Sequence, residues 1–255
     1  MLESLAGLPF DLQFVSFDEA RNGRLNDLDV VLNVGAAGTA FSGGDAWLDP
    51  ALQGAVRGFV ANGGGFIGIG EPTAVNHNGA FFQLSDVLGV DKEQSFSLST
   101  DKYPVENPEH FITADLDGAL DVGDGAGDLY ATSNRTAILR LQDASVELAA
   151  NQAGEGRGVY IAGLPYSHDN ARVLHRAIYW AAGREADFAQ QWVPSNTGVE
   201  VAVFAEAGKA LVMNNLTEAA STTVSGRATG LAGEGEVREL RLDLEPMESR
   251  WVDLA

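Results

Sequence analysis

The chain contains no cysteine among its 255 residues. Without a thiol it forms no disulfides, and it has no thiolate nucleophile, zinc–thiolate site or iron–sulfur cluster. Cysteine-free proteins occur in both reducing and oxidising compartments, so this absence fits a cytoplasmic protein without requiring one.

Basic residues and long apolar runs are also scarce. Lys and Arg number 16 against 36 Asp and Glu, and the formal charge of -20 repels nucleic acids and anionic membranes. No apolar run approaches the roughly 20 residues that span a bilayer, and the first residues, MLESLAGLPF, lack the basic start and apolar core of a signal peptide. We therefore expect a soluble, cytoplasmic protein with neither nucleic acid nor membrane as a partner.

The composition that remains is typical of a globular protein with two domains. Hydrophobic residues make up 45% and charged residues 20% of the chain, which is long enough to bury a substantial core. After Ala186 the helical periodicity stops, and short alternating runs with turn signals begin. We predict an α/β domain over residues 1–187 and a small antiparallel β domain over 188–255.

The first domain begins with alternating strand and helix signals. Strands are predicted over residues 10–17, 29–35 and 65–70, with a helical pattern over 49–64 between the last two. Asp49 is a plausible N-cap and Pro50 fits the first helical position, while Asn62 and Gly63 suit a left-handed end. The two later strands are almost continuously apolar, as parallel strands covered on both faces require.

A second alternation completes this domain. The pattern predicts a helix over 81–90, an irregular acidic region over 91–128, a strand pair over 136–142 and 146–154, and a strand from 157. A helix over 170–183 follows, with Asp169 or Asn170 as its cap. The fold class is therefore α/β with a doubly wound, mostly parallel sheet, followed by an all-β domain with a hairpin turn at 205–211 and a Gly-rich connection at 229–236.

Three polar, Gly-rich loops follow predicted parallel strands, and such loops meet at the carboxyl edge of the sheet. Their polar groups suit sugar hydroxyls or an oxyanion, although tight turns and helix caps would use the same residue types. The primary candidates lie in the loop after residue 69 and are Glu71, Thr73, His77 and Asn78. The secondary candidates lie in the loops after residues 34 and 162 and are Thr39, Ser42, Ser167 and His168.

The stretch FVANGGGFIGIGEPTA, residues 59–74, has the shape of a catalytic elbow without its nucleophile. Glu71 and His77 share one loop and could form an acid/base or orienting pair. Alternatively, Glu71 bonds backbone amides of its own turn and His77 lies at the surface. The consecutive Ser167, His168 and Asp169 are not expected to form a triad, because adjacent side chains seldom face one another.

No metal or cofactor site is predicted. The acidic loop over 115–128 resembles a calcium loop but misses the spacing of glycine and glutamate in an EF-hand. The segment GAAGTAFSGG lacks the lysine of a phosphate-binding loop, and no GxGxxG motif opens the first helix. Inside its predicted helix, His175 is expected to be packed against apolar neighbours.

Two families resemble this sequence. The elbow and the late strand and loop GVYIAGLPYSHDN resemble class I glutamine amidotransferase-like domains, whose chemistry is lost here with the cysteine. The stretches LAGLPFDLQFVSFDE, DVVLNVGAAGTAFSGGDAW, FFQLSDVLGVDKE and LYATSNRTAILRL, together with the elbow, resemble the middle and C-terminal domains of lacto-N-biose/galacto-N-biose phosphorylases. That bacterial family cleaves β-1,3-galactosyl-N-acetylhexosamines with phosphate to galactose 1-phosphate and N-acetylhexosamine.

The second resemblance implies a preceding (β/α)8 barrel with the sugar site and the general-acid aspartate, for which this chain has no room. We therefore expect a C-terminal part of a phosphorylase that carries no catalytic residue and is inactive alone. Its implied partners are the barrel of the same enzyme, a small carbohydrate and phosphate as co-substrate, and a homodimer is left open. In that setting Thr73 and Asn78 would donate hydrogen bonds and Glu71 would orient a ligand.

Two alternatives remain. The chain could be an independent ligand-binding or regulatory module of amidotransferase-like fold, or a cysteine-free hydrolase that uses Glu71 and His77. A barrel-coding segment directly upstream in the gene would favour the phosphorylase.

Overall fold

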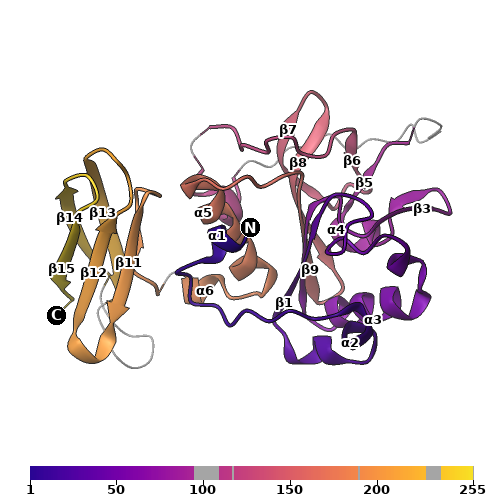
Figure 1. The fold of residues 1–255 in the computed structure, drawn as a ribbon, viewed down its shortest axis with the longest axis horizontal. Helices are drawn as coiled ribbons and strands as arrows, with labels where there is room; N and C mark the ends of the chain where they lie inside the picture. Colours follow the sequence, from indigo (N-terminus) through magenta and orange to yellow (C-terminus); the bar gives the residue numbers. More distant parts are fainter. Residues whose placement is uncertain (95–108, 117, 189, 228–236, 255) are drawn as a thin grey trace.

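The computed structural model describes residues 1–94, 109–116, 118–188, 190–227 and 237–254. Figure 1 shows a mixed α/β part and, at the C-terminal end of the chain, a small β part. The helices are α1 (Leu2–Leu5), α2 (Phe17–Arg21), α3 (Pro50–Ala61), α4 (Ser85–Leu88), α5 (His168–Ala181) and α6 (Glu185–Phe188). The strands are β1 (Val30–Gly35), β2 (Gly65–Gly70), β3 (Ala74–His77), β4 (Ala80–Phe82), β5 (Val90–Lys92), β6 (Leu129–Ala131), β7 (Ala137–Gln142), β8 (Ser145–Ala153), β9 (Gly156–Ile161), β10 (Val193–Pro194), β11 (Val199–Phe204), β12 (Lys209–Asn214), β13 (Ala220–Arg227), β14 (Val237–Leu244) and β15 (Ser249–Asp253).

The central sheet has the strand order β1-β2-β9-β8-β7. Strands β1, β2 and β9 are parallel, and the antiparallel pair β8 and β7 extends the sheet beyond β9. Gly35 pairs with Gly70 and Ile69 with Ile161, so the three parallel strands end at one edge. The predicted α/β class with a mostly parallel sheet, and the predicted pair of strands after residue 136, are confirmed.

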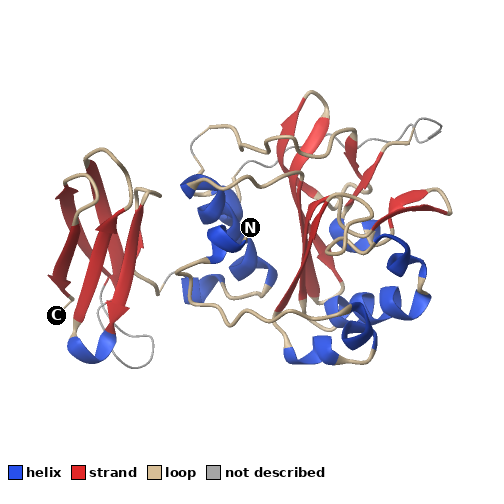
Figure 2. Cartoon of the chain, in the orientation of Figure 1, coloured by secondary structure: helices blue, strands red, loops and turns tan. Residues whose placement is uncertain are grey.

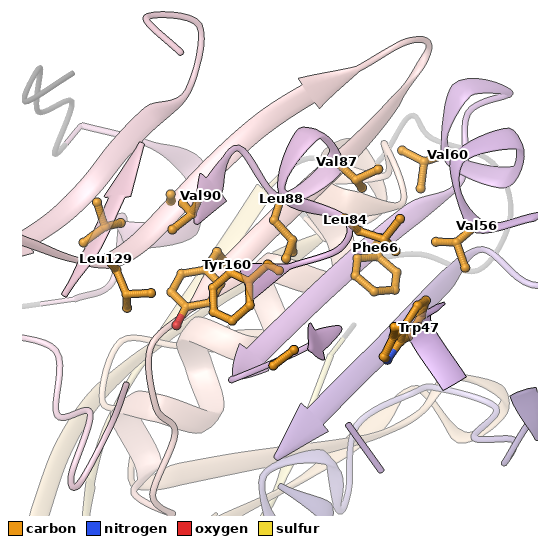
Figure 3. Packing of buried hydrophobic residues seen from close by; sticks show 14 of the residues in the cluster. Trp47, Val56, Val60, Phe66, Leu84, Val87, Leu88, Val90, Leu129 and Tyr160 are labelled. Carbon is orange, nitrogen blue, oxygen red and sulfur yellow. The ribbon is translucent and has the colours of Figure 1, made fainter. Parts of the chain in front are cut away.

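Helices cover both faces of this sheet, with α2, α3 and α4 on one side and α1, α5 and α6 on the other (Figures 1 and 2). Alternate residues of the strands pack against the helices on the two faces, because successive side chains of a strand point to opposite faces. Phe66 of β2 belongs to the core beneath α3, whereas Ile67 belongs to the core beneath α5. Figure 3 shows the first core, in which Val56 and Val60 of α3 lie at one end near Phe66, and Tyr160 lies further along the sheet, near Leu88 and Leu129.

Helix α3 forms where the sequence predicts it. The Asp49 side chain accepts a hydrogen bond from the Ala51 amide at 2.9 Å, Pro50 occupies the first turn, and Gly63 follows with a φ of 106°. Helix α5 also forms, but its cap differs from the prediction. The Ser167 hydroxyl accepts from the Asn170 amide at 3.1 Å, so the helix begins two residues earlier than expected.

Two predicted elements are wrong. Residues 10–16 form no strand; Phe10 packs in the core beneath α5, and Val15 and Phe17 pack in the core beneath α3. The segment therefore passes from one face of the sheet to the other instead of pairing with β1. Two further apolar residues of its alternating pattern, Leu12 and Phe14, are exposed.

The predicted helix over 81–90 is reduced to the single turn α4 between β4 and β5. The Asp91 carboxylate accepts hydrogen bonds from the amides of Phe81 and Phe82 at 3.1 and 2.9 Å, which holds this end of the segment in an extended conformation. Gly89, with a φ of 74°, ends the turn.

The C-terminal part is a sandwich of two antiparallel sheets, β10-β13-β14 and β11-β12-β15, that share one apolar core. It confirms the predicted all-β domain and the predicted hairpin turn, in which Gly208 is left-handed at a φ of 60°. The predicted connection at 229–236 lies outside the described residues. Contacts with the α/β part are polar: Arg172 donates to the Pro194 carbonyl and Thr197 to the Asp169 carboxylate. Over the described ranges, no helix combines the length and apolar character needed to cross a bilayer.

Candidate ligand site at the carboxyl edge of the sheet

A cleft of 530 Å³ opens where β1, β2 and β9 end. Its walls come from the first residues of the loops that follow these strands, from the segment 122–127 and from the end of β5. The lining residues are Met1, Val34, Gly35, Ala36, Ile69, Gly70, Glu71, Lys92, Val122, Gly123, Asp124, Gly125, Ala126, Gly127, Gly163, Leu164 and Pro165. The predicted convergence of the three loops is therefore present.

Glu71 and Lys92 form an ion pair in this cleft. The Lys92 ammonium donates to Glu71 Oε1 at 2.6 Å, and the Ala37 amide donates to Oε2 at 3.0 Å. The two side chains are only 21% and 26% exposed, and the ammonium also lies 5.2 Å from the centre of the Phe81 ring. Burial raises the pKa of Glu71, but the bonds from Lys92 and Ala37 and the Lys92 charge outweigh it, so its pKa lies below the usual range. Glu71 is therefore a carboxylate at neutral pH.

The backbone around Glu71 is fixed by neighbouring strands. The Glu71 amide donates to the Gly35 carbonyl at 2.9 Å, and the buried Tyr160 hydroxyl donates to the Gly70 carbonyl at 2.7 Å. Gly70 itself has a φ of 80°, a conformation that a residue with a Cβ rarely adopts. Strand β2 thus delivers the carboxylate into the cleft in one orientation.

Asn33 connects the loops that follow β1 and β2. It is 5% exposed; its amide nitrogen donates to the Phe41 carbonyl at 2.6 Å and its oxygen accepts from the Thr73 amide at 2.8 Å. Neither Asn33 nor Lys92 is among the residues predicted from the sequence. An amide inside the apolar strand VVLNVG is a signal that could have identified Asn33. Lys92 lies 21 residues from Glu71, and no local pattern connects the two.

The other candidates of the loop after β2 lie away from the cleft. Thr73 is fully buried with a φ of 55°, and its hydroxyl accepts from the Leu84 amide at 3.3 Å. His77 and Asn78 are exposed at the turn between β3 and β4, where Asn78 has a φ of 51°. Both hydrogen bonds to the Glu71 carboxylate come from Lys92 and Ala37, and His77 is not among the residues that line the cleft.

The secondary candidates stabilise loops. Ser42 is fully buried and donates to the Ala36 carbonyl at 2.6 Å, and Thr39 donates to the same carbonyl at 2.8 Å. Ser167 caps α5, and His168, in the first turn of that helix, lies edge-on to Tyr166 with 5.9 Å between ring centres. Among the predicted candidates that the structure describes, Glu71 alone lines the cleft.

The described residues that line the cleft supply binding groups but no hydroxyl or imidazole nucleophile. The side chains that line it, among the described residues, include two carboxylates, Glu71 and Asp124, and the Lys92 ammonium, and they include no Ser, Thr or His. Within the described part of the chain, no group of three or more His, Asp or Glu side chains is arranged to hold a metal ion. The arrangement can hold and orient a polar ligand.

Comparisons with known proteins give consistent matches. The family model for the lacto-N-biose phosphorylase central domain matches residues 1–186, and the model for the C-terminal domain of the same family matches residues 192–252. A 1,3-beta-galactosyl-N-acetylhexosamine phosphorylase of Lachnoclostridium phytofermentans is 43% identical over 98% of this chain and 34% of its own length. The enzyme of the same name from Bifidobacterium longum subsp. longum is 40% identical over 88% of this chain and 34% of its own length.

A more distant relative and a solved structure extend these matches. A D-galactosyl-beta-1->4-L-rhamnose phosphorylase of Lachnoclostridium phytofermentans is 34% identical over 88% of this chain and 31% of its own length. The crystal structure of a β-galactosidase from Rahnella sp. R3 shares the fold with a TM-score of 0.52 at 15% identity, over 97% of this chain and 35% of that one. This chain thus spans about a third of the length of the relatives it matches.

Proposed function

Because this chain belongs to the lacto-N-biose phosphorylase family, we propose that it is the central and C-terminal part of a 1,3-β-galactosyl-N-acetylhexosamine phosphorylase. The complete enzyme would cleave lacto-N-biose or galacto-N-biose with inorganic phosphate and release galactose 1-phosphate, in the cytoplasm of a bacterium. The observation that carries this proposal is the match of both domain models in order, with 43% identity to a phosphorylase of that name over 98% of the chain.

In this proposal the chain supports catalysis and does not perform it. Phosphorolysis with inversion needs an acid that protonates the leaving oxygen while phosphate attacks. The pKa of Glu71 lies below its usual range, so this carboxylate has no proton to give at neutral pH. The general acid is therefore assigned to the part of the enzyme that precedes the central domain, for which we expect a barrel.

The carboxyl edge of the sheet is the surface that suits contact with this preceding part. Phe41 and Tyr166, on the loops after β1 and β9, are 70% and 50% exposed and are therefore accessible for contact with another domain. Met1 lines the cleft, so residues that precede this position in longer family members would start at its rim. We propose that the barrel covers this edge and that the cleft contributes to substrate enclosure.

The test compares the full-length enzyme with the chain of residues 1–255 alone, by release of galactose 1-phosphate from lacto-N-biose. We expect turnover by the full-length enzyme and none above background by the chain alone. Appreciable turnover by the chain alone would show that the catalytic acid lies within these residues.

A substitution tests the role of Glu71 in the full-length enzyme. Glu71→Gln keeps the shape but removes the charge, and a charge-assisted hydrogen bond contributes about 1.5–3 kcal/mol, so kcat/KM should fall about 10- to 100-fold. Glu206→Gln, on the exposed turn between β11 and β12, is the matched control and should not change it. Unchanged kinetics in Glu71→Gln would leave this residue with a purely structural role.

The alternative function, an independent ligand-binding module without activity, is favoured by one observation: residues of this chain line a cleft of ligand size. A gene without a barrel-coding segment upstream would support it. A hydrolase that uses Glu71 and His77 is not supported, because His77 does not line the cleft.

A further inference from the structure

The cleft at the carboxyl edge carries groups of both charges at its floor. The Glu71 carboxylate and the Lys92 ammonium are 2.6 Å apart, and Asp124 adds a second carboxylate to the wall. Lys92 is the one side-chain cation among the described residues that line the cleft. The side-chain charges therefore sum to about -1, and the α-ammonium of Met1, another lining residue, brings the total to about 0 in the chain of residues 1–255.

This distribution of charge in the cleft disfavours the binding of an anion such as phosphate. Phosphate sites combine several Arg, Lys or helix N-terminal groups. Here the Lys92 ammonium is already neutralised by Glu71, and Asp124 would repel a dianion.

A neutral hydroxyl group can form hydrogen bonds with both members of the Glu71–Lys92 ion pair. A hydroxyl both donates and accepts, so one ligand oxygen can donate to the carboxylate and accept from the ammonium. Lys92 has three N–H groups, of which one is directed to Glu71, and each Glu71 oxygen accepts one hydrogen bond from the protein and has a further lone pair free. Paired carboxylate and ammonium groups of this kind select a ligand with several adjacent hydroxyls.

The size and walls of the cleft agree with such a ligand. Its 530 Å³ lies within the range of roughly 300–1,000 Å³ that small-molecule sites occupy. Val34, Ile69, Val122 and Leu164 supply apolar lining, which suits the carbon face of a sugar ring.

The glycines of the cleft divide into two kinds. A Cβ on Gly163 would lie 2.1 Å from the Val122 carbonyl oxygen, and one on Gly125 would lie 3.0 Å from the Ala162 carbonyl oxygen, so the fold itself requires these two. A Cβ on Gly127 would meet nothing within 4 Å, and its φ lies outside the left-handed region. The fold does not require a glycine at position 127. A glycine there instead leaves open space in the cleft for a ligand.

We propose that this cleft is a binding site for a neutral sugar ring, held by hydrogen bonds from its hydroxyls to Glu71 and Lys92, and that it excludes inorganic phosphate. This deepens the proposed function, and it rests on that function only for the choice of galactose and N-acetylglucosamine as probes. In the full-length enzyme the cleft would then enclose the sugar part of a substrate, while phosphate enters elsewhere.

Isothermal titration calorimetry on the chain of residues 1–255 tests the proposal with galactose, N-acetylglucosamine and inorganic phosphate as separate probes. We expect at least one sugar to bind and phosphate to give no heat of binding. Gly127→Leu, which fills the cleft, and Lys92→Met, which removes the ammonium, should each weaken sugar binding at least tenfold. Lys209→Met removes the ammonium of the exposed ion pair with Asp253 and is the matched control, with unchanged binding expected.

Several results would overturn the proposal. Phosphate that binds more tightly than both sugars would reverse the charge argument, and a sugar that binds Gly127→Leu as well as the parent would place its site elsewhere. Absence of binding by both sugars would also refute it. Thermal unfolding of each variant, followed by circular dichroism, checks that lost binding is not lost folding.

The two proposals fail separately. If the full-length enzyme releases galactose 1-phosphate but the chain binds no sugar, the phosphorylase function stands and the sugar site is refuted. If the chain binds a sugar in this cleft but the full-length protein has no phosphorolytic activity, the sugar site stands and the phosphorylase function is refuted.

Discussion

His175 should make this protein sensitive to mild acid. It is 7% exposed, its ring lies 5.0 to 5.6 Å from those of Phe10, Tyr179 and Phe188, and its Nε2 is buried with no hydrogen-bond partner among the described residues. This environment accommodates the neutral imidazole. Protonation inside the folded protein would place an unpaired charge in an apolar aromatic cluster.

Burial lowers the pKa of His175 to about 4, and the charges of Arg172 and Arg176 act in the same direction, against a weaker opposing effect of Asp115. In the unfolded chain the pKa returns to about 6.5, so below that pH the unfolded state binds a proton that the folded state does not. The stabilisation is present above pH 6.5 and is lost as the pH falls from 6.5 towards 4. His175 alone should therefore lower the free energy of unfolding by about 2 kcal/mol between pH 7 and pH 5.

Urea unfolding at pH 7, 6 and 5 measures this effect in the parent and in His175→Phe. Phenylalanine keeps the aromatic contacts and cannot be protonated, so its free energy of unfolding at pH 7 should lie within about 1 kcal/mol of the parent. When the pH is lowered from 7 to 5, the free energy of unfolding of the variant should rise by about 2 kcal/mol relative to that of the parent. Other titrating groups, such as His110, whose pKa is also lowered by burial, act in both proteins and cancel in the comparison.

A control variant and a refuting result complete this test. His77→Gln changes an exposed histidine and should leave the pH dependence of the parent intact. If the difference between the parent and His175→Phe is the same at pH 7 and pH 5, His175 does not titrate as its surroundings require, and the reasoning is refuted.

Two further predictions concern the loops and glycines of the α/β part. Asn33→Ala should lower the free energy of unfolding by about 2–3 kcal/mol in urea titrations, because it leaves the buried Thr73 amide and the part-buried Phe41 carbonyl without these partners; a change below about 0.5 kcal/mol would contradict the role of Asn33 in joining the two loops. Gly156→Ala should cost more than about 3 kcal/mol, since its Cβ would lie 2.1 Å from the Val60 carbonyl oxygen, whereas Gly127→Ala should stay within about 0.5 kcal/mol. Equal melting temperatures for the two glycine variants would show that the backbone near Gly156 can move.

Much of the fold follows from local sequence. Asp49, Pro50 and Gly63 bound helix α3 because capping and backbone preferences act over a few residues. The apolar runs of β1 and β2 predict parallel strands covered on both faces, and the loops that follow them meet at one edge for reasons of topology alone. Glu71, one of the predicted candidates, lies at that edge for the same reason.

Tertiary contacts decided the rest. The alternating pattern of residues 10–17 predicts a strand, but the partly buried Phe10 and Phe17 pack against different cores, and periodicity does not say which core a residue joins. The helix predicted over 81–90 gives way to an extended segment because the Asp91 carboxylate binds two of its amides.

The sequence by itself determined the class of fold, the resemblance of both domains to one family and the absence of a thiol nucleophile, since these depend on local patterns and composition. Only the tertiary structure showed that Lys92 neutralises Glu71, that Thr73 and Ser42 are buried, and that His77 lies outside the cleft. Charges and hydrogen bonds act through space over a few ångströms, so partners that are distant along the chain become visible only once it is folded.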